Sequence, residues 1–258
     1  MIPVLSNILG DRTGGTVFKC FEIWHLLYIG VTAAVIAAVL LLLRRRSLEA
    51  KEKAQRLFID AAFGLYMLDF FLMPFAYGEI DVEKLPFHVC TAMCIGCFVT
   101  RHVKALNGMR VHFALLGFIS NLVYLIYPAG VMWHGVSPFS YRVIQTLTFH
   151  GIMTVYGLIT LVYNRESLRF RYLYRDLILI AGMTLWALLG NFLYSSSLRP
   201  YKAVYNWFFV TGDPFGILPA ETAVWVMPLV NVALFFAVAA GIYCIFAAVR
   251  KAGKQSRN

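Results

Sequence analysis

Three side chains in this sequence have the types and placement that covalent chemistry requires. Cys90 follows Pro86 and opens an apolar run, so we expect it in the first turn of a helix, where unpaired N–H groups and the helix dipole favour a thiolate. A nucleophilic thiolate needs a partner that handles its proton, and His150 is the leading choice. His88 is a poorer partner, because two helical positions separate it from Cys90 by about 200° and place it near Thr91. These residues predict a Cys–His pair, with His88 beside it.

The sequence leaves other interpretations of this cysteine open. A free cysteine is commonly a small apolar core residue, and Cys90 could also form a disulfide with Cys20 on an oxidising side. Cys94 lies closer than Cys90 to the expected depth of His150, so either thiol could be the nucleophile. The five cysteines show no paired CxxC motifs at zinc-finger spacing: Cys20, Cys90, Cys94, Cys97 and Cys244.

Further polar residues interrupt the apolar runs and are predicted to contact a substrate or to support the site. Such residues are costly in lipid and usually face the interior of a helix bundle, although each could simply join neighbouring helices by hydrogen bonds. Asp60 and Asp176 lie beside basic loops and are expected to reach headgroups or water instead. Polar side chains are therefore expected to gather in one cavity at one end of the bundle. The residues predicted to contact a substrate there or to support the site are Gln145, Arg142, His25, Asp69 and Asn191.

A metal-based alternative uses the same histidines. His25, His88 and His150 could hold zinc with one open position. Asp69 would then be either a further ligand or a residue that supports one of the histidine ligands. Lipid hydrolases of the ceramidase and adiponectin-receptor type have seven spans and such a site, and their last span usually carries paired histidines. The last apolar run here, Thr222–Val249, has none. We therefore expect no cofactor, with zinc as the less favoured alternative.

The composition predicts that these residues are held by membrane-spanning helices. The chain has 258 residues, of which 60% are hydrophobic and 14% are charged, and its mean hydropathy is +0.70. So few charges cannot cover a water-soluble domain of this length. The 23 Lys and Arg residues stand in short clusters between apolar runs, which is typical of loops beside anionic headgroups. We expect membrane lipids as partners and no nucleic acid; the sequence does not indicate the oligomeric state.

Seven apolar runs form the predicted spans of one all-α domain, residues 1–258. A hydrocarbon core of roughly 30 Å needs about 20 helical residues. The runs are residues 22–43, 57–77, 86–100, 111–127, 141–163, 174–194 and 222–249. Alternate connections hold 17 of the 23 basic residues, so the positive-inside rule predicts an amino terminus outside and a cytoplasmic carboxyl terminus. The cavity is then expected to face the extracytoplasmic side of the cell membrane.

Short motifs along most of the chain resemble those of the YwaF family of bacterial membrane proteins, whose eukaryotic relative is transmembrane protein 164. The stretch Leu85-Pro86-Phe87-His88-Val89-Cys90 is similar to the LPxHxC-like start of that family's third span. Other stretches are similar to the family's spans one, five and six and to its Gly-Pro loop: Trp24-His25, Tyr141-Arg142-Val143-Ile144-Gln145, Phe149-His150-Gly151, Asn191-Phe192-Leu193-Tyr194 and Gly212-Asp213-Pro214-Phe215.

This resemblance implies seven spans and, from the eukaryotic relative, cysteine–histidine acyl transfer between phospholipids, particularly onto lyso-ether lipids. It assigns His150 as the catalytic histidine. On this hypothesis Cys90 attacks a lipid ester, and Gln145 or His88 donates to the developing oxyanion. The aromatic loop Ala203–Leu218 is expected in the headgroup region, where it guides an acyl chain or anchors the interface. The non-enzymatic alternative is a binding protein or small transporter whose cavity holds an anionic or amphipathic ligand.

Overall fold

All regular secondary structure in the described part of the chain is helical. The computed structural model describes residues 9–11, 16–77, 82–132, 134–195, 206–213 and 216–255. The longer helices are α2 (Ile23–Leu43), α3 (Leu48–Tyr77), α4 (Val89–His102), α5 (Arg110–Ile126), α7 (Tyr141–Tyr163), α8 (Leu173–Ser195) and α9 (Ala220–Gln255). Short helices connect them: η1 (Val82–Lys84), η2 (Lys104–Met109), α6 (Ala129–Met132), η3 (Arg165–Ser167), η4 (Phe170–Tyr172) and η5 (Trp207–Phe209).

The predicted polytopic helical bundle is confirmed. Six helical segments are long and apolar enough to cross a membrane, and α4 is a shorter apolar helix. With 14 residues, α4 extends about 21 Å, which is less than the roughly 30 Å hydrocarbon core. Large apolar side chains on the outer helices are more than two-thirds exposed, as lipid-facing residues are: Ile23, Leu42, Phe192, Trp225 and Leu229.

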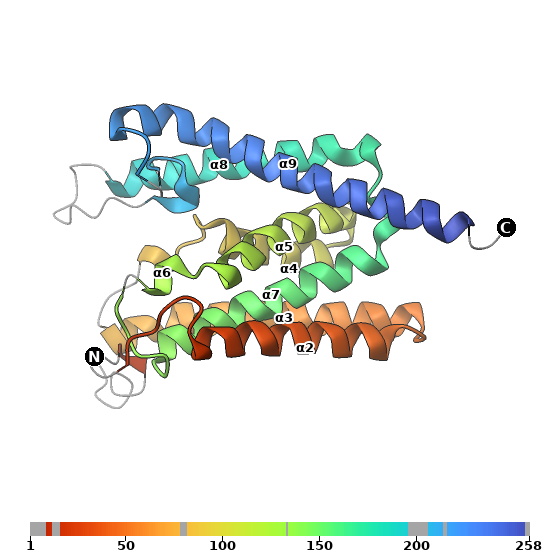
Figure 1. Cartoon of the computed structure of the whole chain (residues 1–258), viewed down its shortest axis with the longest axis horizontal. Helices are drawn as coiled ribbons and strands as arrows, with labels where there is room; N and C mark the ends of the chain where they lie inside the picture. Colours follow the sequence, from red (N-terminus) through yellow and green to blue (C-terminus); the bar gives the residue numbers. More distant parts are fainter. Residues whose placement is uncertain are drawn as a thin grey trace.

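The helices run side by side along one axis (Figure 1). Helices α2, α3 and α7 lie together on one side, α4 and α5 lie in the middle, and α8 and α9 pair on the other side. The contact between α5 and α7 is the most extensive in the bundle. Helix α2 begins at one end of the bundle and α9 finishes at the opposite end, which agrees with an odd number of passes.

The starts of two helices differ by three or more residues from the predicted spans, and each has a local cause. Helix α9 also continues to Gln255, six residues beyond the predicted end at Val249. Helix α3 begins at Leu48, and not at Leu57, because the charged stretch 49–56 contains strong helix formers (Glu, Ala, Lys, Gln and Arg). The predicted third span, 86–100, begins later as α4. Residues 85–88 form a turn, and His88 is the N-cap residue of α4 with extended backbone (φ −70°, ψ 136°). Pro86 therefore lies in this turn and is not the first helical residue.

A close contact between α5 and α7 depends on a glycine. A methyl group added at Gly157 would lie 2.6 Å from the Cβ of Phe118 and 3.1 Å from the backbone oxygen of Ala114. Small residues at such positions allow helix backbones to pack closely in membranes. We expect Gly157→Ala to lower the free energy of unfolding in detergent by about 1–3 kcal/mol through overpacking.

A matched control for this substitution lies on α8. An added methyl group at Gly182 would have no neighbour within 4 Å. Gly182→Ala should therefore leave stability unchanged or raise it slightly, because alanine has the higher helix propensity. Equal thermal unfolding midpoints for the two variants would contradict the close α5–α7 contact.

Candidate functional site

One cavity gathers six of the eight residues predicted for the site. Its volume is about 120 Å³, and it lies near the end of the bundle at which both α4 and α7 begin. The predicted residues that line it are Asp69, His88, Cys90, Arg142, Gln145 and His150. The other lining residues are Tyr66, Lys84, Thr91, Tyr124, Gly130, Val131, His134, Thr146 and Phe149.

His150 is held in a single orientation by its own helix and by α5. Its Nδ1 lies 2.7 Å from the backbone oxygen of Thr146, one turn earlier in α7. A carbonyl only accepts hydrogen bonds, so Nδ1 carries the proton and Nε2 is the nitrogen that can accept one. The ring of Tyr124 stacks on the imidazole, with 3.8 Å between ring centroids and 12° between planes. His150 is therefore oriented beside the cavity with Nε2 as the nitrogen that can act as a base.

Cys90 is the second residue of α4 and lies at the boundary between the cavity and the core. Its side chain is 9% exposed and packs in the largest apolar cluster, while its thiol contacts the hydroxyl of Ser120. No hydrogen bond between Cys90 and His150 is present among the described residues. Cys94 is fully buried and does not line the cavity. Of the two thiols that the sequence left open, Cys90 is the one that reaches the cavity.

The disulfide alternative for Cys90 is wrong, because Cys20 and Cys90 are both free thiols. Cys20 is only partly buried, and its Sγ lies 3.6 Å from the backbone oxygen of Ile126.

His88 lines the same cavity as Cys90. If both residues were helical, their separation of two positions would place the two side chains on nearly opposite sides of the helix. The helical rule fails here because His88 is the N-cap of α4 and its backbone is extended. Its imidazole is exposed and meets the indole of Trp207 edge-on, with 6.3 Å between ring centroids. Thr91 donates a hydrogen bond to the backbone oxygen of His88 at 3.0 Å. The start of α4 therefore presents both residues to one space.

Two ion pairs border the cavity. Lys84 Nζ lies 2.7 Å from Asp69 Oδ2, and the Asp69 side chain is only 2% exposed. Arg142 Nε donates to Asp11 Oδ1 at 2.9 Å, and its Nη1 lies 3.4 Å from His134 Nε2. The cavity therefore holds two basic side chains, each beside a carboxylate that partly neutralises it.

His25 and Asn191, both predicted for the site, do not line the cavity. His25 Nδ1 accepts a hydrogen bond from the backbone of Phe21 at 2.9 Å, and its Nε2 donates to Leu125 O at 2.8 Å. Asn191 exchanges two hydrogen bonds with the backbone of Trp207, at 3.2 Å and 3.1 Å. In this structure both side chains join segments of the chain.

The metal alternative gains no support from this geometry. Zinc binds a histidine through a nitrogen lone pair, and the lone pair of His25 already accepts a backbone hydrogen bond. Within the residues that the structure describes, no three His, Cys, Asp or Glu side chains are grouped so that they could hold a metal ion.

Several cavity residues were not identified from the sequence. Lys84 is one base in a connection between apolar runs, and Tyr124 and Thr146 are ordinary residues of apolar helices, so nothing in the sequence distinguishes them.

The buried ring of Trp207 packs on Phe87, with 5.0 Å between ring centroids. Trp207 is therefore packed inside the protein, while the position of the segment Ala203–Leu218 at the headgroup level stays a prediction. Residues 203–205 and 214–215, which include Tyr205 and Phe215, lie outside the described residues.

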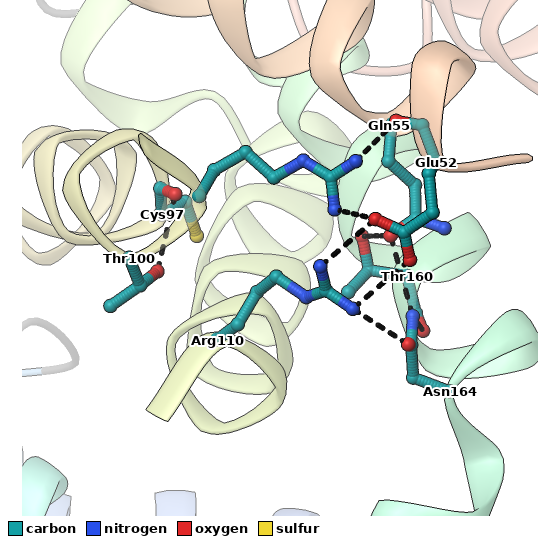
Figure 2. Close-up of polar contacts among 8 residues, drawn as sticks. Glu52, Gln55, Cys97, Thr100, Arg110, Thr160 and Asn164 are labelled. Atoms are coloured by element: carbon teal, nitrogen blue, oxygen red, sulfur yellow. Dashed lines mark hydrogen bonds and ion pairs between the residues drawn. The ribbon is translucent and has the colours of Figure 1, made fainter. Parts of the chain in front are cut away.

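The expectation that polarity is confined to one end is also wrong. Asp176 is 2% exposed, accepts a hydrogen bond from His112 Nδ1 at 2.9 Å, and accepts another from the Tyr243 hydroxyl at 2.6 Å. Asp60 is partly exposed, as expected, and pairs with His102. A third polar group surrounds Glu52 near the start of α3 (Figure 2). The bundle therefore buries polar clusters toward both ends.

Long apolar helices with exposed apolar surfaces, and polar side chains that face a cavity inside the bundle, define an integral membrane protein of the multi-pass α-helical class. Residues 20–249 match the family model of the TMEM164 family, so the chain belongs to this family. The family inferred from the short motifs is thereby confirmed. Comparisons with curated proteins and with solved structures gave no match.

Proposed function

We propose that this protein transfers acyl groups between membrane lipids, with Cys90 as nucleophile and His150 as the proton-handling base. The observation that carries the proposal is the state of His150. Its Nδ1–H is bound to Thr146 O, which leaves Nε2 able to take a proton, and the same cavity is lined by Cys90. Thiol nucleophiles in acyl transfer depend on such a base.

The proposed reaction has two half-steps. The Cys90 sulfur attacks the ester carbon of a donor lipid while His150 Nε2 takes the thiol proton. The ester C–O bond then breaks, and His150 returns the proton to the departing lysolipid oxygen, which leaves an acyl thioester on Cys90. In the second half-step an acceptor hydroxyl attacks the thioester, its proton passes to His150, and the C–S bond breaks. The proton finally returns to the Cys90 sulfur, which restores the enzyme.

Other cavity residues fit supporting roles in this reaction. The side-chain amide of Gln145 and the imidazole of His88 are polar donors that face the cavity, where a developing oxyanion needs hydrogen bonds. Arg142 and Lys84 bring positive charge toward a lipid phosphate. The missing Cys90–His150 hydrogen bond is compatible with the proposal, because catalytic hydrogen bonds often close only when substrate is bound. The clustering of basic residues in alternate loops supports an extracytoplasmic position for the cavity.

The proposal is tested by trapping the acyl group. Full-length protein in vesicles would be incubated with a phospholipid carrying isotopically labelled acyl chains, then digested and analysed by mass spectrometry. We expect a labelled acyl group on Cys90 that hydroxylamine removes, as it cleaves thioesters. The adduct should be absent in Cys90→Ser and present in Cys94→Ser, because Cys94 does not reach the cavity.

A binding protein or transporter would give a different result in the same experiment. It would retain labelled lipid without any covalent bond to Cys90. The absence of an adduct, together with acyl exchange that is unchanged in Cys90→Ser, would overturn the proposal.

A further inference from the structure

A second and larger cavity lies at the opposite end of the bundle from the candidate site. Its volume is about 560 Å³, which falls within the range of ligand pockets. Glu52, beside this cavity, precedes Asp69 by 17 residues on α3, so the two cavities are roughly 25 Å apart along the helix. The lining residues come from α3, α4, η2 and α5: Glu49, Glu52, Lys53, Arg56, Thr100, Arg101, Lys104, Asn107 and Arg110.

A single carboxylate, that of Glu52, forms ion pairs with two buried guanidinium groups in this cavity. Arg110 donates to Glu52 through Nη1 to Oε2 at 3.0 Å and through Nη2 to Oε1 at 3.2 Å. Arg101 forms an ion pair with the same carboxylate and also donates to the backbone oxygen of Glu52. The side chains of Arg101 and Arg110 are only 5% and 13% exposed. One carboxylate cannot neutralise both cations.

The neighbouring polar side chains hold these groups in place. Arg110 Nη2 also donates to Asn164 Oδ1 at 2.8 Å, and Asn164 Nδ2 donates to Gln55 Oε1 at 3.3 Å. Figure 2 shows Arg110 directed at Glu52 and Asn164, with Gln55 and Thr160 next to them. The amide nitrogen of Gln55 and the Nε of Arg101 are buried without a hydrogen-bond partner among the described residues. The arginines are thus fixed in position, and one of their donors is unused.

The cavity as a whole is positively charged. Five basic residues line it, against two acidic ones. Lys53, Arg56 and Lys104 have exposed side chains and stand around the buried arginines. A buried cation without sufficient counter-charge is unfavourable, and a bound anion would relieve this cost. The guanidinium group of an arginine binds phosphate through two parallel hydrogen bonds. Basic pockets between membrane helices bind acidic lipid headgroups.

We propose that this cavity binds a phosphate group, which pairs with Arg101, Arg110 and the surrounding basic side chains. The phosphate belongs either to the headgroup of an acidic lipid or to a soluble phosphate compound, because both present the same charge and geometry. This site is independent of acyl transfer: it lies at the other end of the bundle, and its test measures binding.

The test compares two double variants that remove the same charge. Arg56→Gln with Lys104→Gln removes two bases that line the cavity and leaves the Glu52 pairs intact. Arg45→Gln with Arg46→Gln removes two exposed bases from the turn after α2 that do not line it. Full-length protein in nanodiscs of neutral phosphatidylcholine would be titrated with phosphatidylglycerol, and in a separate arm with glycerol 3-phosphate and inorganic phosphate. Native mass spectrometry would count bound molecules, and thermal unfolding would give the affinity.

The cavity variant is expected to weaken binding of the first phosphate-bearing molecule at least about tenfold, while the turn variant stays within about twofold of the unmodified protein. Binding of phosphatidylglycerol alone would identify a lipid headgroup, and binding of the soluble phosphates would identify a soluble ligand. Equal weakening in both double variants, or binding in neither arm, would overturn the proposal.

Discussion

Replacing His150 with alanine is expected to lower the rate of acyl transfer by at least about a hundredfold. A positioned general base contributes roughly 10²–10⁴-fold to such reactions. The loss should appear in the rate of transfer and much less in lipid binding. Proteoliposomes with one labelled donor phospholipid and one lysophospholipid acceptor would measure both quantities.

His102→Gln is a suitable control for this experiment. His102 lies at the other end of α4, where it pairs with the partly exposed Asp60, and it does not line the candidate site. Its replacement should leave the transfer rate unchanged. Normal turnover in His150→Ala, with a thermal midpoint close to that of the unmodified protein, would show that His150 is not the base.

Replacing Lys84 with methionine is expected to lower the free energy of unfolding by about 3–5 kcal/mol. The substitution leaves the carboxylate of Asp69 without its ion-pair partner, and this side chain is only 2% exposed. Breaking a buried pair from one side is costly because the remaining charge is neither hydrated nor paired. Unfolding in detergent, followed by a signal specific to tertiary structure, would measure the change.

The double variant Lys84→Met with Asp69→Leu separates this mechanism from simple loss of packing. Removing both charges is often nearly neutral, so the double variant should recover most of the lost stability. A double variant that is less stable than Lys84→Met alone would contradict the role of the ion pair. Acyl transfer need not recover, because both residues line the candidate site.

The helices themselves were largely predictable from the sequence. The predicted span 141–163 has the same bounds as α7, and the span predicted over 174–194 differs from α8 by one residue at each end. Bilayer thickness and the cost of unpaired backbone groups in lipid fix the length and the helical form of each span. The main departures among the helix starts, at α3 and α4, came from a charged stretch that continues a helix and from an extended N-cap.

The site was predictable to the extent that each residue revealed its own chemistry. Cys90 and His150 were identified because a thiol near a helix start and an imidazole within an apolar span are unusual. The Lys84–Asp69 pair was missed, because neither residue reveals the other across a segment of 15 positions. The burial of Asp176 was missed for the same reason, since its partners His112 and Tyr243 are more than 60 residues away.

The sequence by itself determined that lipid surrounds this protein, that its spans are helical, and where most helices begin and end. These properties follow from local hydropathy and a fixed membrane thickness. Only the tertiary structure decided which polar side chains share a cavity. His25 bonds to Leu125 and Asn191 to Trp207, so both join segments of the chain, whereas Cys90 and His150 face a common space. The physical reason is that the role of a buried polar group depends on the partner that satisfies it, and helix packing brings that partner from a distant segment.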